Sequence, residues 1–320
     1  MALYSSAMQI ATIDVGTSTA KLLIAEVDSE SVVRSLYEEQ RFVRIGAGVD
    51  ATGRVGDAAM RRLRDALLAY QAISKEYGVS HIIVGATSAS RDAENKIEIV
   101  EYVNRETGLE YEILSGEDEA KWSFAGTIST LDDLDTTCTV IDIGGGSTEF
   151  IVGDTAGNIT FRRSLNVGSV RLTERFFSGL PPRGLEIERA EALIIRLLEE
   201  SGVLLDSTMP FVVAGGSLEA LALLLGGAPS FRELSGSNLS LQVHEVQRWR
   251  ERVLMSTYDE VLAFDPIVMQ GRADVFPAGV LILYTVMQRF GFSVCRVSFR
   301  GLRYGLALRF IGGDFSNTMS

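Results

Sequence analysis

Histidine and cysteine are scarce in this chain of 320 residues, which holds two of each. His81 and His244 are too isolated from each other to build a metal cluster, and no Ser-His-Asp or Cys-His catalytic arrangement is expected around them. Cys138 and Cys295 each lie inside an apolar, strand-like run, which predicts two buried free thiols and suits a reducing compartment.

Positive charge and long apolar runs are also lacking. The net charge is −12 and the isoelectric point is about 4.8, so we expect no general attraction to nucleic acid or to an anionic membrane. The most apolar helix candidate, residues 275–287, is too short to span a bilayer and contains Pro277 and Gly279. The first residues lack the basic segment of a signal peptide, and we expect a cytoplasmic protein.

Glycine is plentiful, at 31 residues, and three glycines are consecutive in residues 137–153, TCTVIDIGGGSTEFIVG. This order of residues predicts a strand, a glycine turn and a second strand. Glycine lets backbone N–H groups close around an anion such as phosphate, and the hydroxyl of Ser147 adds a donor. Asp142, at the mouth of the turn, is placed to hold a hydrated Mg²⁺ ion, and Glu149 to join it or to position water.

The same order of features occurs in residues 9–25, QIATIDVGTSTAKLLIA, which include Asp14, Gly16 and several hydroxyls. Taken alone, each segment would also fit a tight β-hairpin whose glycines serve only the turn. Two copies make an internal repeat at domain scale and favour anion binding. Neither copy is a Rossmann or P-loop motif, because both of those motifs continue into a helix and not into a strand.

Alternating helix and strand patterns follow each hairpin. We predict an amphipathic helix over residues 56–77, a segment over 87–92 that leads into a helix through about residue 106, a strand over 211–214, a charged helix over 241–257 and an apolar helix over 275–287. The length suits two domains of ordinary size. We therefore expect two α/β domains that face each other across a cleft, with a short hinge-like helix near residues 119–126.

Two further polar segments are open to two interpretations. Arg91 follows a hydroxyl-rich turn between a strand and a helix, which suits either an oxyanion site or a serine N-cap beside a surface arginine. Glu119 lies in an acidic first turn of a helix, and such residues ordinarily compensate the helix dipole.

Seven segments, taken in order, resemble the signature segments of the exopolyphosphatase and guanosine pentaphosphate phosphatase (Ppx/GppA) family: IDVGTSTAKLLI, RIGAGVDATGRV, GATSASRDAEN, EILSGEDEA, VIDIGGGSTEF, AGGS and GRADVFPAG. The resemblance covers nearly the whole chain and implies the fold of the actin, hexokinase and acetate-kinase superfamily, with two ribonuclease-H-like α/β domains around an interdomain cleft. The expected domains are residues 1–124, with a C-terminal helix over 303–320 packing back on them, and residues 125–302. The chain resembles the short form of the family, which has no C-terminal HD-type metal phosphohydrolase-like domain.

The resemblance also implies roles for single residues. Glu119 corresponds to the general base that activates the attacking water, in place of the dipole explanation. Asp142 and Glu149 correspond to the acidic residues that hold Mg²⁺ and order that water, and Arg91 to an arginine that contacts phosphate. The residues that match the two phosphate loops are Asp14, Gly16, Thr17, Ser18 and Lys21 in the first, and Gly144, Gly145, Gly146 and Ser147 in the second.

Three positions depart from the family pattern. Lys21 stands where many relatives carry arginine, and a lysine neutralises phosphate without the bidentate fork of a guanidinium. Ala47 and Tyr304 stand where relatives often carry glutamate, which concerns the packing of loops and not the chemistry.

The activity implied by the resemblance is Mg²⁺-dependent hydrolysis of a terminal phosphoanhydride, either in inorganic polyphosphate or in guanosine pentaphosphate. A kinase shares the scaffold, and a guanosine tetraphosphate sensor without turnover is the non-enzymatic alternative. We expect polyphosphate as the substrate, and the chain to act alone or as a homodimer. Arginines outside the two loops would extend a basic track for a long anion, namely Arg44, Arg171, Arg272, Arg300 and Arg303.

Overall fold

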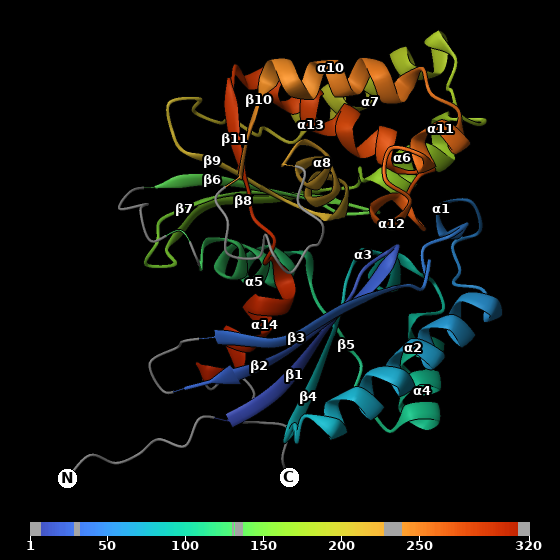
Figure 1. Ribbon diagram of the computed structural model, residues 1–320, viewed down its shortest axis with the longest axis vertical. Helices are drawn as coiled ribbons and strands as arrows, with labels where there is room; N and C mark the ends of the chain where they lie inside the picture. The colour runs from blue at the N-terminus through green and yellow to red at the C-terminus, as the bar shows by residue number, and fades with distance from the viewer. Residues whose placement is uncertain (1–7, 29–32, 130, 132–136, 227–238, 313–320) are drawn as a thin grey trace. The chain divides into compact units, whose positions relative to one another are not determined.

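The computed structural model describes residues 8–28, 33–129, 131, 137–226 and 239–312. The chain forms two compact units (Figure 1). Unit 1 is Met1–Gly126 together with Gly301–Ser320, and unit 2 is Thr127–Arg300. The predicted boundaries, after residue 124 and before residue 303, lie close to the two points at which the chain passes from one unit to the other. Residues 313–320 of the predicted C-terminal helix lie outside the described residues.

Unit 1 contains a sheet of five strands in the order β3-β2-β1-β4-β5. The strands are β1 (Met8–Val15), β2 (Thr19–Val27), β3 (Val33–Phe42), β4 (His81–Ala86) and β5 (Glu112–Ile113). The first three form an antiparallel meander, whereas β4 is parallel to β1, and β5 is parallel to β4. The hairpin predicted over residues 9–25 is therefore confirmed as β1 and β2.

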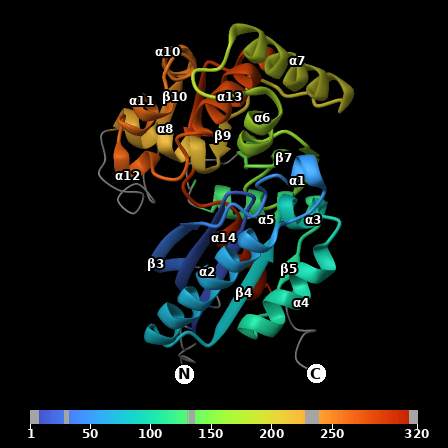
Figure 2. The ribbon, with the colours of Figure 1, turned by 90° about the vertical axis from the view of Figure 1, so that its right-hand side faces the viewer.

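Helices cover both faces of this sheet (Figures 1 and 2). The helices of unit 1 are α1 (Val49–Thr52), α2 (Asp57–Glu76), α3 (Ser88–Asp92), α4 (Lys96–Thr107), α5 (Gly116–Ile128), whose last residues enter unit 2, and α14 (Leu302–Ile311). Neighbouring residues of β1 alternate between the faces, so Ala11 packs in the cluster of Leu63 from α2, and Ile10 in that of Leu306 from α14. A sheet that is buried on both faces needs apolar side chains at most positions, which explains why β1 and β2 are mostly apolar.

The helix predicted to follow residues 87–92 is confirmed as α4. The leading segment itself contains the short helix α3, which is separate from α4 because Ala93 has an extended backbone, with φ −69° and ψ 132°. The side chain of Asn95 then accepts a hydrogen bond from the N–H of Val55 and donates one to its carbonyl, both at 3.0 Å. This pairing spans 40 residues of sequence, so no local pattern announces it. The helix predicted over residues 56–77 is confirmed as α2.

Unit 2 contains a sheet of six strands in the order β10-β11-β9-β6-β7-β8. The strands are β6 (Cys138–Ile143), β7 (Thr148–Gly153), β8 (Ile159–Leu165), β9 (Phe211–Ala214), β10 (Leu239–Gln242) and β11 (Val294–Val297). As in unit 1, the first three strands form an antiparallel meander, and the next strand, β9, is parallel to the first. The internal repeat inferred from the two hairpins is thus a repeat of sheet topology.

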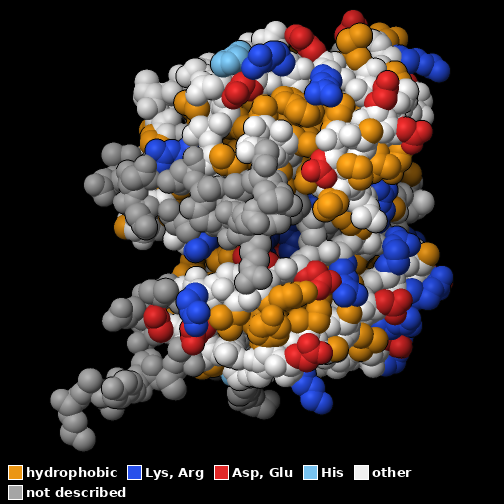
Figure 3. Space-filling view, in the orientation of Figure 1, with side chains coloured by type: hydrophobic (Ala, Val, Ile, Leu, Met, Phe, Trp, Pro, Cys, Tyr) orange, Lys and Arg blue, Asp and Glu red, His pale blue; other side chains and the backbone are white. Residues whose placement is uncertain are grey.

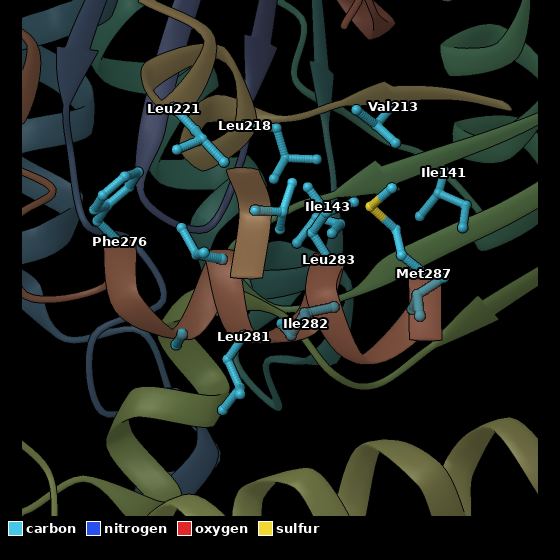
Figure 4. Close-up of a cluster of buried hydrophobic side chains, with 14 of the residues drawn as sticks. Ile141, Ile143, Val213, Leu218, Leu221, Phe276, Leu281, Ile282, Leu283 and Met287 are labelled. Carbon is cyan, nitrogen blue, oxygen red and sulfur yellow. The ribbon is translucent and has the colours of Figure 1, made fainter. Parts of the chain in front are cut away.

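One large apolar core fills unit 2 (Figure 4). The helices are α6 (Ser169–Phe176), α7 (Gly184–Glu200), α8 (Gly216–Gly226), α10 (Val243–Leu254), α11 (Tyr258–Leu262), α12 (Pro266–Met269) and α13 (Phe276–Phe290). The predicted apolar helix is confirmed as α13, whose Leu283 and Met287 lie in the core with Ile141 of β6 and Val213 of β9. Burial of this helix on nearly all sides explains why its sequence is apolar all round.

The charged helix predicted over residues 241–257 begins later than expected. Leu241 belongs to β10 and pairs with Cys295 of β11. The helix α10 starts only after Gln242, whose backbone N–H donates to the carboxylate of Glu245 at 2.9 Å. In this capping box, the Glu245 side chain in the first turn of α10 accepts a hydrogen bond from the backbone N–H of the N-cap residue, Gln242.

Both cysteines are free thiols and are buried, as predicted. Burial raises the pKa of Cys138 to about 11 and that of Cys295 to about 12, so both thiols stay protonated at neutral pH. Among the helices of the described residues, none combines the length and the apolar character that crossing a membrane requires.

Candidate active site

The turns of the two hairpins are closed by equivalent hydrogen bonds. In the first turn, the N–H of Gly16 donates to the carbonyl of Thr19 at 2.9 Å. In the second, the N–H of Gly144 donates to the carbonyl of Ser147 at 3.0 Å. The two turns therefore have the same length and the same backbone closure, although only the second contains three consecutive glycines.

The second turn is held by the beginning of α6. The N–H of Ser169 donates to the carbonyl of Gly144 at 2.9 Å, and the N–H of Val170 donates to the carbonyl of Gly145 at 2.8 Å. Because a trans peptide unit is planar, with its C=O and N–H on opposite sides, the N–H groups of Gly145 and Gly146 point away from α6. Two successive amides that point to the same side form a concave site for an anion.

Close packing keeps this turn in place. Gly168, just before α6, lies against the backbone of the turn, and a Cβ atom on it would lie 2.5 Å from the carbonyl carbon of Gly145. The side chain of Ser147 is buried, at 2% exposure, so its hydroxyl serves the interior of the turn or a ligand in it. Glycine at position 168 is therefore required by its packing against the turn.

The first turn is held by a loop and not by a helix. The N–H of Gly46 donates to the carbonyl of Thr17 at 2.9 Å, and the N–H of Arg44 donates to the carbonyl of Ser18 at 2.8 Å. By the same peptide geometry, the N–H of Ser18 points away from this loop. The hydroxyl of Thr17 also shares a hydrogen bond of 2.9 Å with that of Ser88, which ties the turn to α3.

The hairpins differ in the charges that face each other. Asp14 of β1 is paired directly with Lys21 of β2, and Asp142 of β6 is paired directly with Glu149 of β7. Side chains of directly opposed residues leave the sheet on the same face. Ser164 of β8 lies next in this row, and its hydroxyl donates to the Glu149 carboxylate at 2.8 Å.

The pair of Asp142 and Glu149 fits a magnesium ion. Glu149 is 2% exposed, and two like charges directly opposite each other in a sheet destabilise it unless a cation lies between them. Among the described residues, no group of three or more His, Cys, Asp or Glu side chains could bind a metal ion through protein ligands alone. Mg²⁺ does not need one, because it commonly binds one or two carboxylates and keeps water and phosphate oxygens as its other ligands.

Arg91 and Glu119 form an ion pair in unit 1. Nη1 of Arg91, at the end of α3, donates to Oε2 of Glu119 at 2.6 Å and to the carbonyl of Leu114 at 3.1 Å. Glu119 is 8% exposed, although it lies in the first turn of α5. The N-terminus of α5 is capped by a different pair, since the N–H of Asp118 donates to the hydroxyl of Ser115 at 3.0 Å.

These contacts contradict one of the interpretations that the sequence left open. The N-cap residue of α3 is Thr87, which makes no side-chain capping bond, so the serine N-cap with a surface arginine is wrong. Asp118 makes the local contact at the start of α5, which leaves Glu119 turned toward Arg91. Sequence reasoning missed Ser164 and Ser88, although the alternation along β8 places Ser164 opposite Glu149.

The expected basic track is wrong for two of its five arginines. Arg272 is 5% exposed and donates to the carbonyl of Gly216. Arg303 is 7% exposed and donates to the carboxylate of Glu38 at 2.7 Å. Both guanidinium groups are engaged inside their own units, because a buried charge requires a partner. Arg44, Arg171 and Arg300 are partly exposed.

A cavity of about 460 Å³ lies elsewhere in unit 2, at the beginning of β9 and β11. Its lining includes Ser207, Ser240 and Arg296 and the stacked rings of Phe211 and Phe292, whose centroids are 4.1 Å apart. Because β6 and β9 are parallel, this end of the sheet is opposite to the end that carries the triple-glycine turn. None of the predicted site residues lines the cavity.

Comparisons with known proteins show the family of the chain. A family model described as the Ppx/GppA phosphatase family matches residues 23–312. Exopolyphosphatase 2 of Mycobacterium tuberculosis is 29% identical over 319 residues, which span 95% of this chain and 99% of that protein. The crystal structure of an exopolyphosphatase from Cytophaga hutchinsonii has a TM-score of 0.84 at 26% identity and covers 96% of this chain and 98% of its own. That of the Aquifex aeolicus Ppx/GppA family member has a TM-score of 0.77 at 27% identity and covers 98% of this chain and 99% of its own.

Proposed function

The chain belongs to the Ppx/GppA phosphatase family, and from this premise we propose that it removes the terminal phosphate of inorganic polyphosphate in a Mg²⁺-dependent hydrolysis. The proposal is carried by the two opposed carboxylates, Asp142 and Glu149, beside a turn that presents backbone amides to an anion. A carboxylate pair next to an anion site is the arrangement that a metal–phosphate complex requires.

The turns bind the phosphates of the substrate. In unit 2, the N–H groups of Gly145 and Gly146 donate to phosphate oxygens, and in unit 1 the N–H of Ser18 does so. Lys21 adds a positive charge at the first turn, opposite Asp14. Asp142 and Glu149 would hold a Mg²⁺ ion. The ion would neutralise negative charge on the phosphates, which a protein with a net charge of −12 does not do in general.

Glu119 takes the proton of the attacking water. The water oxygen bonds to the terminal phosphorus, the bond from that phosphorus to the bridging oxygen breaks, and the shortened polyphosphate leaves with that oxygen. Arg91 orients the base, because its Nη1 donates to Oε2 of Glu119. A guanidinium has five N–H donors, so Arg91 keeps this contact and still offers donors to a phosphate.

The choice of polyphosphate over guanosine pentaphosphate is supported by full-length similarity to relatives named exopolyphosphatase. The test is phosphate release from both substrates side by side, with kcat/KM measured for each. If kcat/KM for guanosine pentaphosphate were at least about tenfold above that for polyphosphate, guanosine pentaphosphate would be the preferred substrate. This ratio corresponds to about 1.4 kcal/mol of transition-state stabilisation. Binding of guanosine tetraphosphate with no release from either substrate would identify a sensor instead.

A further inference from the structure

Ser164 is the outermost member of a row of side chains that crosses the unit 2 sheet. In the strand register, Ala214 of β9 lies beside Asp142 of β6. On the other side of Asp142 come Glu149 of β7 and then Ser164 of β8, the edge strand. Paired residues leave a sheet on the same face, so these four side chains project together. Ser164 is the one member of the row whose side chain can donate a hydrogen bond to an ionised carboxylate.

The hydroxyl of Ser164 does not serve the core of unit 2. The residues that alternate with the row, among them Ile141, Phe150 and Leu165, belong to the apolar core on the opposite face of the sheet. Ser164 itself is partly exposed. A partly exposed hydroxyl on an edge strand can bond to water, so the fold does not oblige it to contact another side chain. Its bond to Glu149 therefore calls for a reason other than core packing.

This hydrogen bond fixes the orientation of the Glu149 carboxylate. Oγ of Ser164 donates to Oε1 of Glu149 at 2.8 Å, and Glu149 is 2% exposed. The terminal torsion of a glutamate has broad energy minima, so burial alone does not set the plane of its carboxylate. A bond to one named oxygen does set it. An ionised carboxylate has about four acceptor sites, so this bond is compatible with metal binding by the same group.

The position of the donor also matters for the opposed acids. Asp142 lies on one side of Glu149 in the row, and Ser164 lies on the other side. Two like charges directly opposite each other repel. A donor on the β8 side favours one position of Glu149 in the presence of this repulsion, and it holds that position before a cation arrives.

We propose that Ser164 is a positioning residue of the metal site, and that its hydroxyl holds the Glu149 carboxylate in the orientation that binds Mg²⁺. The inference rests on the proposed function and deepens it, because Ser164 acts through Glu149 and touches neither the substrate nor the reacting atoms. Carboxylates that bind metals are commonly oriented by such hydrogen bonds, and loss of one typically costs about 10- to 100-fold in metal affinity.

Binding of Mn²⁺ to the full chain without substrate tests the proposal apart from turnover. Electron paramagnetic resonance of free Mn²⁺ gives the affinity, and Mg²⁺ is added as a competitor. Ser164→Thr and Ser164→Val introduce side chains of nearly equal shape, both suited to a strand, and only threonine keeps a hydroxyl. Thr160→Val is the matched control, since it removes a hydroxyl of the same strand that donates to the carbonyl of Val152 at 3.2 Å.

Two further measurements make the comparison secure. Asp and Glu side chains are scattered over the face of the protein in Figure 3, and carboxylates are ligands that Mn²⁺ accepts. Asp142→Asn measures this background, because it lacks one of the two opposed acids. Melting temperatures in EDTA verify that each variant is folded during the titration. Ser164→Ala, which adds no atoms, removes the hydroxyl if valine proves too large.

We expect Ser164→Val to bind Mn²⁺ about 10- to 100-fold more weakly than the wild type. Ser164→Ala should be weakened likewise, whereas Ser164→Thr and Thr160→Val should bind Mn²⁺ as the wild type does. The Mg²⁺ concentration for half-maximal hydrolysis of polyphosphate should rise by a similar factor in the two variants without the hydroxyl, and in neither of the others.

Wild-type Mn²⁺ affinity in Ser164→Val and Ser164→Ala would overturn the proposal. Equal weakening in Ser164→Thr and Ser164→Val would also overturn it, because the shape of the side chain and not the hydroxyl would then be the cause. Both results leave the proposed function in place as long as the wild type hydrolyses polyphosphate. A wild type that binds Mn²⁺ no more tightly than Asp142→Asn, or that releases no phosphate at any Mg²⁺ concentration, would instead overturn the metal site or the proposed function itself.

Discussion

Glu149 lies directly opposite Asp142 across the hairpin of β6 and β7, so two carboxylates share one face of the unit 2 sheet. At the equivalent place in unit 1, Lys21 lies opposite Asp14. The sequence separation within each pair is the same, from 14 to 21 and from 142 to 149. One hairpin therefore carries an acid opposite a base, and the other carries two acids opposite each other, which is the pair to which we assign Mg²⁺.

This difference predicts a specific effect of Asp142→Asn. The variant should need more Mg²⁺ for activity or lose activity altogether, because one carboxylate is a large share of a magnesium site. In EDTA its free energy of unfolding should be unchanged or higher by up to about 1 kcal/mol, since a repulsion between opposed like charges is removed. Mg²⁺ titrations of activity, together with denaturant unfolding in EDTA, measure both effects. Superimposable Mg²⁺ titrations of variant and wild type would remove Asp142 from the metal site.

The reciprocal change, Lys21→Glu, should give unit 1 a second pair of opposed carboxylates. We expect the variant to bind more Mn²⁺ per chain than the wild type and to bind polyphosphate more weakly, because a cation at the first turn is replaced by an anion. Electron paramagnetic resonance of bound and free Mn²⁺ counts the sites. Lys75→Glu, at an exposed position of α2, makes the same change of charge away from the hairpin. Equal Mn²⁺ stoichiometry for Lys21→Glu and Lys75→Glu would argue against the comparison of the hairpins.

Glu119→Gln tests the assigned base. The amide keeps the size of the side chain and an acceptor for Arg91, but it cannot take a proton from water. We expect kcat to fall by about 10²- to 10⁴-fold, with little change in substrate affinity. Steady-state kinetics and a separate binding measurement tell loss of chemistry from loss of binding. A kcat close to that of the wild type would mean that another group activates the water.

The sequence predicted those features whose cause is local. The two hairpins were readable because apolar runs, an acid and glycines occur in the same order twice, and α13 because its apolar run is continuous. The pairing of Asn95 with Val55 was not readable, because these two residues are 40 positions apart in the sequence. The burial of Arg303 depends likewise on Glu38, a residue 265 positions away.

The candidate site shows the same limit. Residue types and resemblance indicated Glu119 and Arg91 separately, and the ion pair between them appears only in the folded chain. Nothing in the composition of the loop that holds the first turn shows that the N–H of Gly46 donates to Thr17 or that Arg44 has a left-handed backbone. Those facts follow from backbone contacts between distant segments.

From the contact of Glu38 with α14 we predict how the free energy of unfolding depends on pH. Burial opposes ionisation of Glu38, but the charge of Arg303 and hydrogen bonds from Tyr304, Arg303 and Ser35 hold its pKa below the ordinary value. A carboxyl group whose pKa is lowered by folding stabilises the protein above its unfolded pKa, and this stabilisation is lost as pH falls through the folded pKa. Glu38→Gln should therefore cost about 1–3 kcal/mol at neutral pH.

Denaturant unfolding of Glu38→Gln and wild type across the acid range checks this. The difference in free energy of unfolding should shrink as the pH drops below the ordinary range of a glutamate. A difference that stays constant down to the acid limit would show that packing, and not ionisation, explains the effect.

Gly168→Ala tests whether close packing shapes the anion site of the second turn. A Cβ atom at residue 168 would lie 2.5 Å from the carbonyl carbon of Gly145 and 2.7 Å from the amide nitrogen of Gly146. Neither neighbour is a flexible side chain, so the turn and the start of α6 must move apart. We expect a loss of about 1–3 kcal/mol in stability, as for other overpacked sites, together with weaker phosphate binding. Gly184→Ala is the control in the same unit, because a Cβ atom there meets nothing within 4 Å. If Gly168→Ala bound tripolyphosphate as tightly as Gly184→Ala, the amides of the turn would not be the groups that hold the anion, since those amides are the atoms that the added methyl group displaces.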